Sequence, residues 1–228
     1  MTSARQIYLG SRRGPALPYD AEVEYLESTG TQWIDTGVFL SGSSKIGMSA
    51  ILPDLYENLA LFGASNGAAY NNGEVSLFIS GPTLPKKLTA VYPTSNSSST
   101  IVSISNRPKY TPNVLSEMSF DGTGFSIQGI KYPSTWYSAY QAERTCALFA
   151  VNRSGGNGQY CSKIKVSMFS IDKGGVLVRD MISVRFTNEQ GVSEGAMYDR
   201  VSGQLFRNSG TGVFGFGTDI AGGGGINV

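Results

Sequence analysis

The stretch that decides the fold is residues 195–217, GAMYDRVSGQLFRNSGTGVFGFG. It predicts two short strands, residues 196–199 and 204–208, joined by a turn at residues 200–203. A second glycine-rich turn then leads into an aromatic strand at residues 213–217. Glycine suits turns that need a positive φ, and aromatic residues between such turns are typical of half-buried strands. The pattern predicts the closing hairpin and last strand of an all-β domain.

A second signature, EYLESTGTQWIDTGV at residues 24–38, lies near the other end of the chain. Between the two, about a dozen short apolar segments alternate with turn-forming residues at the spacing of a sandwich or barrel. Residues 137–145, YSAYQAERT, are the one segment for which we expect a short helix. No linker interrupts residues 22–217, so we expect one domain.

The composition supports many strands and excludes several functions. The 228 residues include 29 glycines, and charged residues make up 15% of the chain, below the usual quarter. With 18 basic and 17 acidic side chains, no positive surplus favours nucleic acid. The chain has no histidine, which removes the commonest general base and every Ser-His or Cys-His nucleophile pair.

No stretch is apolar for long enough to be a signal peptide or to span a bilayer. We therefore expect no membrane partner, and a protein that leaves its host cell by lysis if it acts outside one.

Two cysteines, Cys146 and Cys161, flank the turn-rich segment around residues 152–158. This spacing could place them on neighbouring strands of one hairpin. Free cysteine is often buried, which favours two buried thiols, while a disulfide stays open for a protein that matures outside a reducing cytosol.

The two end signatures, together with LFGASNG at residues 61–67 and CALFAVNRSGG at residues 146–156, resemble the concanavalin A-like/LamG-type jelly-roll domains of gut bacterial and phage proteins. The resemblance implies an all-β fold, a concanavalin A-like (LamG-like) jelly-roll β-sandwich, over residues 22–217. Because the terminal strands of jelly rolls often meet, it also implies that the two end signatures are neighbours in space. An extended N-terminal anchoring arm, residues 1–21, precedes it, and a Gly-rich tail, residues 218–228, follows.

The arm contains IYLGSRR, in which Ile7, Tyr8, Leu9, Arg12 and Arg13 are the candidate assembly residues. This segment is similar to the short segments at the start of phage baseplate and tail polypeptides. Proline residues nearby favour an extended chain.

With the jelly roll, this resemblance implies a phage virion structural protein without enzymatic activity: a capsid decoration or auxiliary protein, a tail component or a fibre. It would be assembled in the host cytoplasm into the virion. Its expected partners are other virion proteins, through the arm, and host surface glycans. A homotrimer fits such appendages, although no heptads specify one.

The aromatic loop at residues 133–144 is the candidate glycan- or partner-binding site. Trp136, Tyr137 and Tyr140 follow Pro133, which indicates a surface loop. Aromatic rings serve sugar binding and protein interfaces alike, and a packing or subunit-contact role is favoured over a sugar.

Residues 22–27, EVEYLE, are the nearest match to the E-x-D-x-x-E strand that carries the catalytic carboxylates in glucanases of the wider superfamily. Here Glu22 and Glu24 share a strand face, Glu27 does not, and no central Asp is present. The pattern favours a solvated strand face, so we expect no catalytic residues. A bacterial carbohydrate-binding or adhesin module is the alternative function, and a glycoside hydrolase ranks below it.

The resemblance also raises the question of calcium, because some LamG relatives bind this ion through oxygen atoms of loop residues. Asn66, Asn71, Asn72 and Glu74 offer such oxygens, but no regular calcium-loop spacing appears. Local turn chemistry explains the asparagines better, so we expect no metal and no cofactor.

Overall fold

The computed structural model describes residues 17–54, 59–67, 72–80, 87–104, 110–153 and 157–220. These residues form strands and turns in two sheets of eleven and eight strands. The larger sheet runs in the order β11 (Ile130–Pro133), β10 (Gly124–Ile127), β9 (Leu115–Asp121), β4 (Ser44–Ile51), β15 (Lys165–Lys173), β16 (Val176–Thr187), β17 (Ser193–Asp199) and β18 (Gln204–Phe206), with β1 (Ala21–Glu22), β2 (Leu26–Glu27) and β19 (Gly215–Phe216) at its side. The smaller sheet runs in the order β14 (Gly158–Gln159), β13 (Val151–Asn152), β5 (Leu59–Ser65), β6 (Glu74–Ser80), β7 (Lys87–Pro93) and β8 (Ser99–Ile104), with β12 (Gln141–Leu148) beside β5 and β3 (Ile34–Ser41) beside β12.

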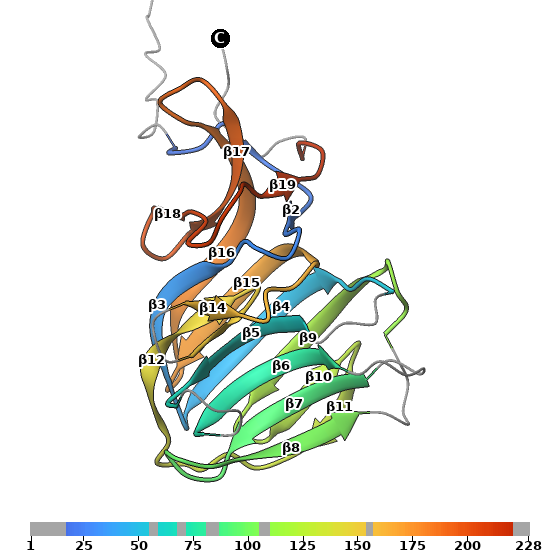
Figure 1. Cartoon of the computed structure of the whole chain (residues 1–228), viewed down its shortest axis with the longest axis vertical. Helices are drawn as coiled ribbons and strands as arrows, with labels where there is room; N and C mark the ends of the chain where they lie inside the picture. The colour runs from blue at the N-terminus through green and yellow to red at the C-terminus, as the bar shows by residue number, and fades with distance from the viewer. Residues whose placement is uncertain are drawn as a thin grey trace, which may run out of the picture.

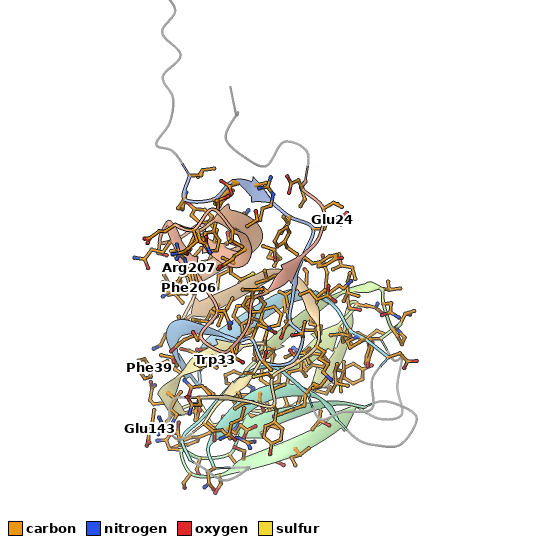
Figure 2. All side chains as sticks on the ribbon, turned by 45° about the horizontal axis from the view of Figure 1, so that its top comes forward. Glu24, Trp33, Phe39, Glu143, Phe206 and Arg207 are labelled. Atoms are coloured by element: carbon orange, nitrogen blue, oxygen red, sulfur yellow. The ribbon has the colours of Figure 1, made fainter. Side chains whose placement is uncertain are left out.

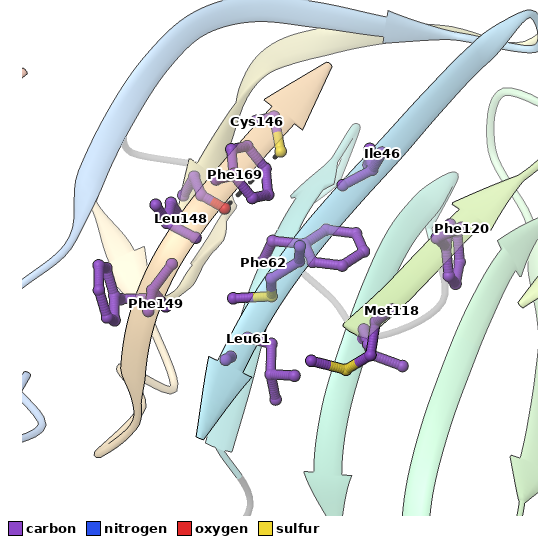
Figure 3. Packing of buried hydrophobic residues seen from close by; sticks show 14 of the residues in the cluster. Ile46, Leu61, Phe62, Met118, Phe120, Cys146, Leu148, Phe149 and Phe169 are labelled. Carbon is purple, nitrogen blue, oxygen red and sulfur yellow. Dashed lines mark hydrogen bonds between the residues drawn. The ribbon is translucent and has the colours of Figure 1, made fainter. Parts of the chain in front are cut away.

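The two sheets pack face to face as a β-sandwich, which confirms the predicted all-β sandwich class (Figure 1). One apolar core fills the space between them, with residues from both sheets. At its centre, Phe62 of β5 lies edge-on to Phe120 of β9, with ring centroids 5.5 Å apart, and 6.1 Å from the ring of Phe169 in β15 (Figure 3). Alternate residues of each strand face this core because successive side chains point to opposite faces.

The stretch at residues 195–217 forms the predicted hairpin. Strands β17 and β18 pair antiparallel, and the buried Asp199 organises the turn between them. Its carboxylate accepts hydrogen bonds from the Ser202 hydroxyl (2.6 Å) and from the backbone amides of Asp180, Val201 and Ser202. Burial alone would raise the pKa of Asp199, but these hydrogen bonds outweigh it and hold the pKa below its usual value.

The two end signatures meet in space, as the sequence predicts. Strand β19 pairs with β2, and the Ser209 amide donates to the Trp33 carbonyl at 2.8 Å. The Trp33 amide in turn donates to the Asn208 side chain at 3.2 Å. Gly210 lies so close to the Thr31 carbonyl that no side chain fits there. The close approach of the two backbones therefore explains why the motif has a glycine at this position.

The segments that adjoin the two chain ends pack together on β16. Tyr19 is buried, with its ring 4.9 Å from that of Tyr198, and Arg185 forms ion pairs with Asp20 (3.6 Å) and Asp219 (2.7 Å). We call this end of the molecule, residues 17–24 and 215–220 with β17 and β18, the terminal pole (Figure 1). Residues 19–21, which the predicted arm includes, are therefore packed on the sandwich.

The arm residues Ile7, Tyr8, Leu9, Arg12 and Arg13 lie outside the described residues.

The predicted short helix at residues 137–145 is wrong. Most of this segment belongs to β12, which pairs with β3 from Gln141 opposite Ser41 onward. The Ala, Glu and Arg residues of this segment have good helix propensity, but pairing along two neighbouring strands outweighs so weak a preference.

The two cysteines do not share a hairpin. Cys146 lies in β12, and Cys161 forms an isolated parallel β-bridge with Ala60 of β5. Both are free thiols, Cys146 buried and Cys161 half-buried. Burial raises the pKa of both, so both thiols are protonated at neutral pH.

Candidate functional site

The aromatic loop between β11 and β12 has one exposed ring, where the sequence predicts three on the surface. Tyr137 is 40% exposed, whereas Trp136 and Tyr140 are buried at 3% and 0%. The Trp136 ring packs 5.3 Å from Phe120 and 6.2 Å from Tyr92 in the main core. The loop turns back onto the sandwich, which corrects the expected exposure of Trp136 and Tyr140 and leaves only Tyr137 accessible to a ligand.

The backbone around Tyr137 is fixed by hydrogen bonds. Its amide donates to the Pro93 carbonyl at 2.8 Å, and its carbonyl accepts from the Tyr140 amide at 2.9 Å. The Tyr140 carbonyl accepts from Gly42, and its hydroxyl donates to the Gly73 carbonyl at 2.8 Å. The buried Tyr140 thus positions the exposed Tyr137, so a ligand that contacts the Tyr137 ring would not have to order its backbone.

Two asparagine side chains tie the loops at Asn66 and Asn96 to the start of β12, which follows Tyr137 in the chain. The Asn66 amide group donates to the carbonyls of Asn96 (2.9 Å) and Gln141 (3.0 Å), and its oxygen accepts from the Glu143 amide (2.7 Å). The Gln141 amide donates to the Asn96 side chain at 3.0 Å. We call this set, Asn66, Asn96, Tyr137, Gln141 and Glu143, the rim; Figure 2 marks its place at Glu143.

The rim combines an aromatic surface with polar groups. Asn96, Gln141 and Glu143 are exposed, as is Tyr137. The amide side chains donate and accept hydrogen bonds, the Glu143 carboxylate accepts them, and a tyrosine adds a rigid amphipathic ring with a hydroxyl. This is the combination that a sugar, with its hydroxyl groups and apolar ring face, requires.

The candidate calcium ligands serve other roles. Asn66 ties the loops of the rim, Asn72 accepts a backbone hydrogen bond from Asn66 at 3.1 Å, and Glu74 is buried in an ion pair. Asn71 lies outside the described residues. Within the described ranges, no three side chains of Asp, Glu, Cys or His are grouped so that they could hold a metal ion.

A buried ion pair, which no sequence pattern predicts, lies on the outer face of the smaller sheet. Glu74 of β6 and Arg153 meet at 2.8 Å with side chains 0% and 3% exposed. The Ser76 hydroxyl donates to the other carboxylate oxygen at 2.6 Å. The half-exposed Tyr160 covers the pair, with its ring centre 4.9 Å from the Arg153 guanidinium carbon. The one signal in the sequence is an arginine directly after the apolar run CALFAVN.

Two residues on either side of Arg153, Phe149 and Tyr160, have a strained backbone conformation. Phe149 and Tyr160 both have positive φ, 68° and 56°, although neither is glycine. Hydrogen bonds hold both ends of the segment, from Phe149 to the Leu61 carbonyl and from Ala60 to the Tyr160 carbonyl, each 2.8 Å. Such strain persists only where the surroundings over-determine it, and it clusters at functional sites. Tyr160 is therefore a second candidate contact residue.

Of the carboxylates of residues 22–27, Glu22 and Glu24 lie at the terminal pole and Glu27 lies in β2. Glu22 accepts a hydrogen bond from the Tyr19 hydroxyl at 3.2 Å, and Glu24 is exposed. Glu27 lies 3.8 Å from Lys165. In the part of the chain that the structure describes, no helix is both long and apolar enough to cross a bilayer.

The chain matches no protein-family model, and comparison with curated proteins found no match. Membership of the concanavalin A-like/LamG-type family therefore stays a prediction. Among solved structures, it is similar to the enzymatically active domain of tailspike protein 2 from bacteriophage CBA120, at 10% identity and a TM-score of 0.41, over 73% of this chain and 30% of that one. It is also similar to the NanB sialidase of Streptococcus pneumoniae, at 12% identity and a TM-score of 0.49, over 87% and 39%. The chain thus spans well under half the length of each, and identities so low do not establish what it binds.

One prediction is contradicted by these comparisons. The sequence predicts a protein without enzymatic activity, whereas the similar structures are a tailspike domain described as enzymatically active and sialidases. The prediction rested on the lack of one carboxylate pattern in residues 22–27 and on the lack of histidine. Those observations exclude particular catalytic constellations, not catalysis as a whole.

Proposed function

We propose that this protein is a component of a phage virion, as a capsid decoration, tail or fibre protein, that contacts host surface glycans through the rim. In this proposal the sandwich is one domain between an N-terminal anchoring arm and a Gly-rich tail, and it attaches to the particle by the terminal pole. The support is the spatial separation of the terminal pole from the rim.

That separation is set by β3. Next to its first residue, Trp33 is hydrogen-bonded to Asn208 and Ser209, close to β18 of the terminal pole. At its last residue, Ser41 pairs with Gln141 of the rim. A strand of eight residues spans about 26 Å at 3.3 Å per residue. Figure 2 shows Trp33, Phe39 and Glu143 in this order, with Glu24 at the terminal pole. A molecule held by its terminal pole would therefore present the rim to its surroundings.

The chemistry of the rim supports a glycan as its ligand. Gln141 and Glu143 lie at the start of β12, which follows Tyr137 in the chain, and Asn66 ties this strand to the loop at Asn96, so the surface is pre-organised. Pre-organised polar groups beside an aromatic ring give affinity for ligands with many hydroxyl groups at little ordering cost.

A glycan array and a host-cell binding assay test the rim. Tyr137→Ala should weaken glycan retention by about tenfold, as expected for the loss of an aromatic contact. Val201→Ala is the control, because Val201 is similarly exposed, at 49%, but lies in the turn between β17 and β18, beside the terminal pole. An array that stays blank for the wild type, or equal losses in the two variants, would refute binding at the rim.

Particle assembly tests the anchor. Deletion of residues 2–16 leaves Tyr19 and Asp20 in place, so we expect a folded sandwich that is no longer incorporated into particles. Incorporation at the wild-type level would contradict anchoring by the arm, and it would leave the glycan result unaffected.

A further inference from the structure

Strand β8 is an edge strand without the usual protection. Its sequence, STIVSI at Ser99–Ile104, contains no charge, proline or glycine, and four of its six residues are β-branched. Residues 94–104 as a whole carry no charged side chain. Edge strands with these properties offer their unpaired backbone groups to another strand.

The other outer strands among the described residues are each protected. At the other end of the smaller sheet β14 has only two residues, and in the larger sheet β18 has three. Strand β11 carries Lys131 and Pro133. Strand β3 is longer, but Gly37 interrupts it with a positive φ, and the Arg179 side chain donates to the Thr36 carbonyl at 2.8 Å. Short length, lysine, proline and a covering side chain all hinder edge pairing, and within the described ranges β8 has none of them.

The backbone N–H and C=O groups of Ser99, Ile101 and Ser103 point away from β7, toward the open edge of the sheet. The Thr94 amide donates to the Ser98 carbonyl at 2.9 Å, so these two residues form a hydrogen-bonded pair. Antiparallel pairs alternate between bonded and non-bonded. The register pairs Pro93 with Ser99 and Val91 with Ile101, so these are the non-bonded pairs, consistent with the missing N–H of proline. In a non-bonded pair the N–H and C=O groups point away from the partner strand. Ser99, Ile101 and, by the same alternation, Ser103 therefore have unpaired backbone groups at the edge.

We propose that a second copy of this chain pairs with β8 antiparallel, about a two-fold axis at Ile101. In this register Ile101 of each copy faces the other, and Ser99 faces Ser103. Three bonded pairs would give about six backbone hydrogen bonds. The Ile101 side chain is 43% exposed and gains an apolar partner at the axis, where no like charges meet. An isologous contact of this kind is self-complementary and closes at two subunits.

Analytical ultracentrifugation of the full chain tests the dimer, together with Ile101→Pro and Ile101→Lys. Proline is tolerated where the N–H of an edge strand faces solvent, and here it removes two of the proposed hydrogen bonds. We expect a wild-type dimer at micromolar concentration and a dissociation constant at least about tenfold higher for Ile101→Pro. Ile101→Lys, which places two lysines face to face, should also be monomeric, and more strongly so at low salt. Ile101→Ala keeps the N–H and should remain largely dimeric.

Several results would overturn the proposal. A monomeric or trimeric wild type excludes the two-fold β8 contact, and so does a dimer that both variants leave intact. If Ile101→Pro fails to fold by circular dichroism, the Ile101→Lys result decides, because an exposed lysine is well accommodated on an edge strand.

Discussion

Replacement of Arg153 by methionine would test how strongly the buried ion pair holds the outer face of the smaller sheet. The Glu74 carboxylate is 0% exposed, its partner guanidinium is 3% exposed, and the two lie 2.8 Å apart. Without the arginine, the Ser76 hydroxyl is the remaining side-chain partner of this carboxylate among the described residues. An uncompensated buried charge costs about 3–5 kcal/mol. We therefore expect the free energy of unfolding to fall by that amount.

Urea denaturation measures this loss, and a thermal melt gives a second reading. For a domain of this size, each kcal/mol shifts Tm by roughly 2–4 °C, so the expected decrease is about 6–20 °C. The double variant Glu74→Gln/Arg153→Met should recover much of the loss, because no charge is left buried. Arg207→Met is the matched control: Arg207 is exposed and lies 4.4 Å over the Phe186 ring, so it should cost no more than about 1 kcal/mol.

Two results would refute this reasoning. A loss below about 1 kcal/mol for Arg153→Met would give the pair the value of a surface salt bridge. A double variant as unstable as the single one would show that the shape of the arginine matters, and not its charge.

Three further changes test the assignment of core, turn and close contact. Trp136→Ala should cost about 3–5 kcal/mol in urea denaturation, whereas Tyr137→Ala should stay within about 0.5 kcal/mol; similar losses would contradict their different burial. Because the pKa of Asp199 lies below its usual value, its carboxylate stabilises the fold above about pH 4 and loses this effect as the pH falls through the folded value. Asp199→Asn should therefore be less stable at neutral pH and show a flatter decline of the urea midpoint on acidification; an unchanged acid profile would contradict this. Gly158→Ala would place a Cβ 2.5 Å from the Trp33 ring and should lower Tm through a loss of about 1–3 kcal/mol, so an unchanged Tm would contradict the close contact.

The parts of the fold that the sequence predicts correctly are turns that depend only on residues close together in the chain. Asp199 and Gly203 lie close together in sequence, and the side chain of Asp199 bonds to its own turn. Turns of this kind need no distant partner, so the hairpin of residues 195–217 can be predicted from its residues alone. The meeting of the chain ends was predicted from the paired signatures of a family resemblance.

The features that the sequence does not predict depend on long-range contacts. Glu74 and Arg153 are 79 residues apart, and neither residue type at its position indicates the other. The loop after Pro133 looks exposed from its composition, yet Trp136 is buried because the core between Tyr92 and Phe120 accepts its ring. Burial depends on which surfaces the rest of the chain brings nearby, and periodicity within a loop carries no such information.

The proposed anchor and the proposed dimer make different geometric demands. Figure 1 shows β8 at the end of the sandwich away from the terminal pole. A two-fold axis at β8, perpendicular to its sheet, would point the two terminal poles in opposite directions. The two chains of such a dimer could not both attach to the same site on the particle, because their terminal poles face opposite ways. Ile101→Pro should therefore leave incorporation of the monomer into particles intact, while deletion of residues 2–16 should leave the dimer intact in solution. If either change abolished both properties, the two surfaces would be coupled, and the separation of attachment from pairing would be wrong.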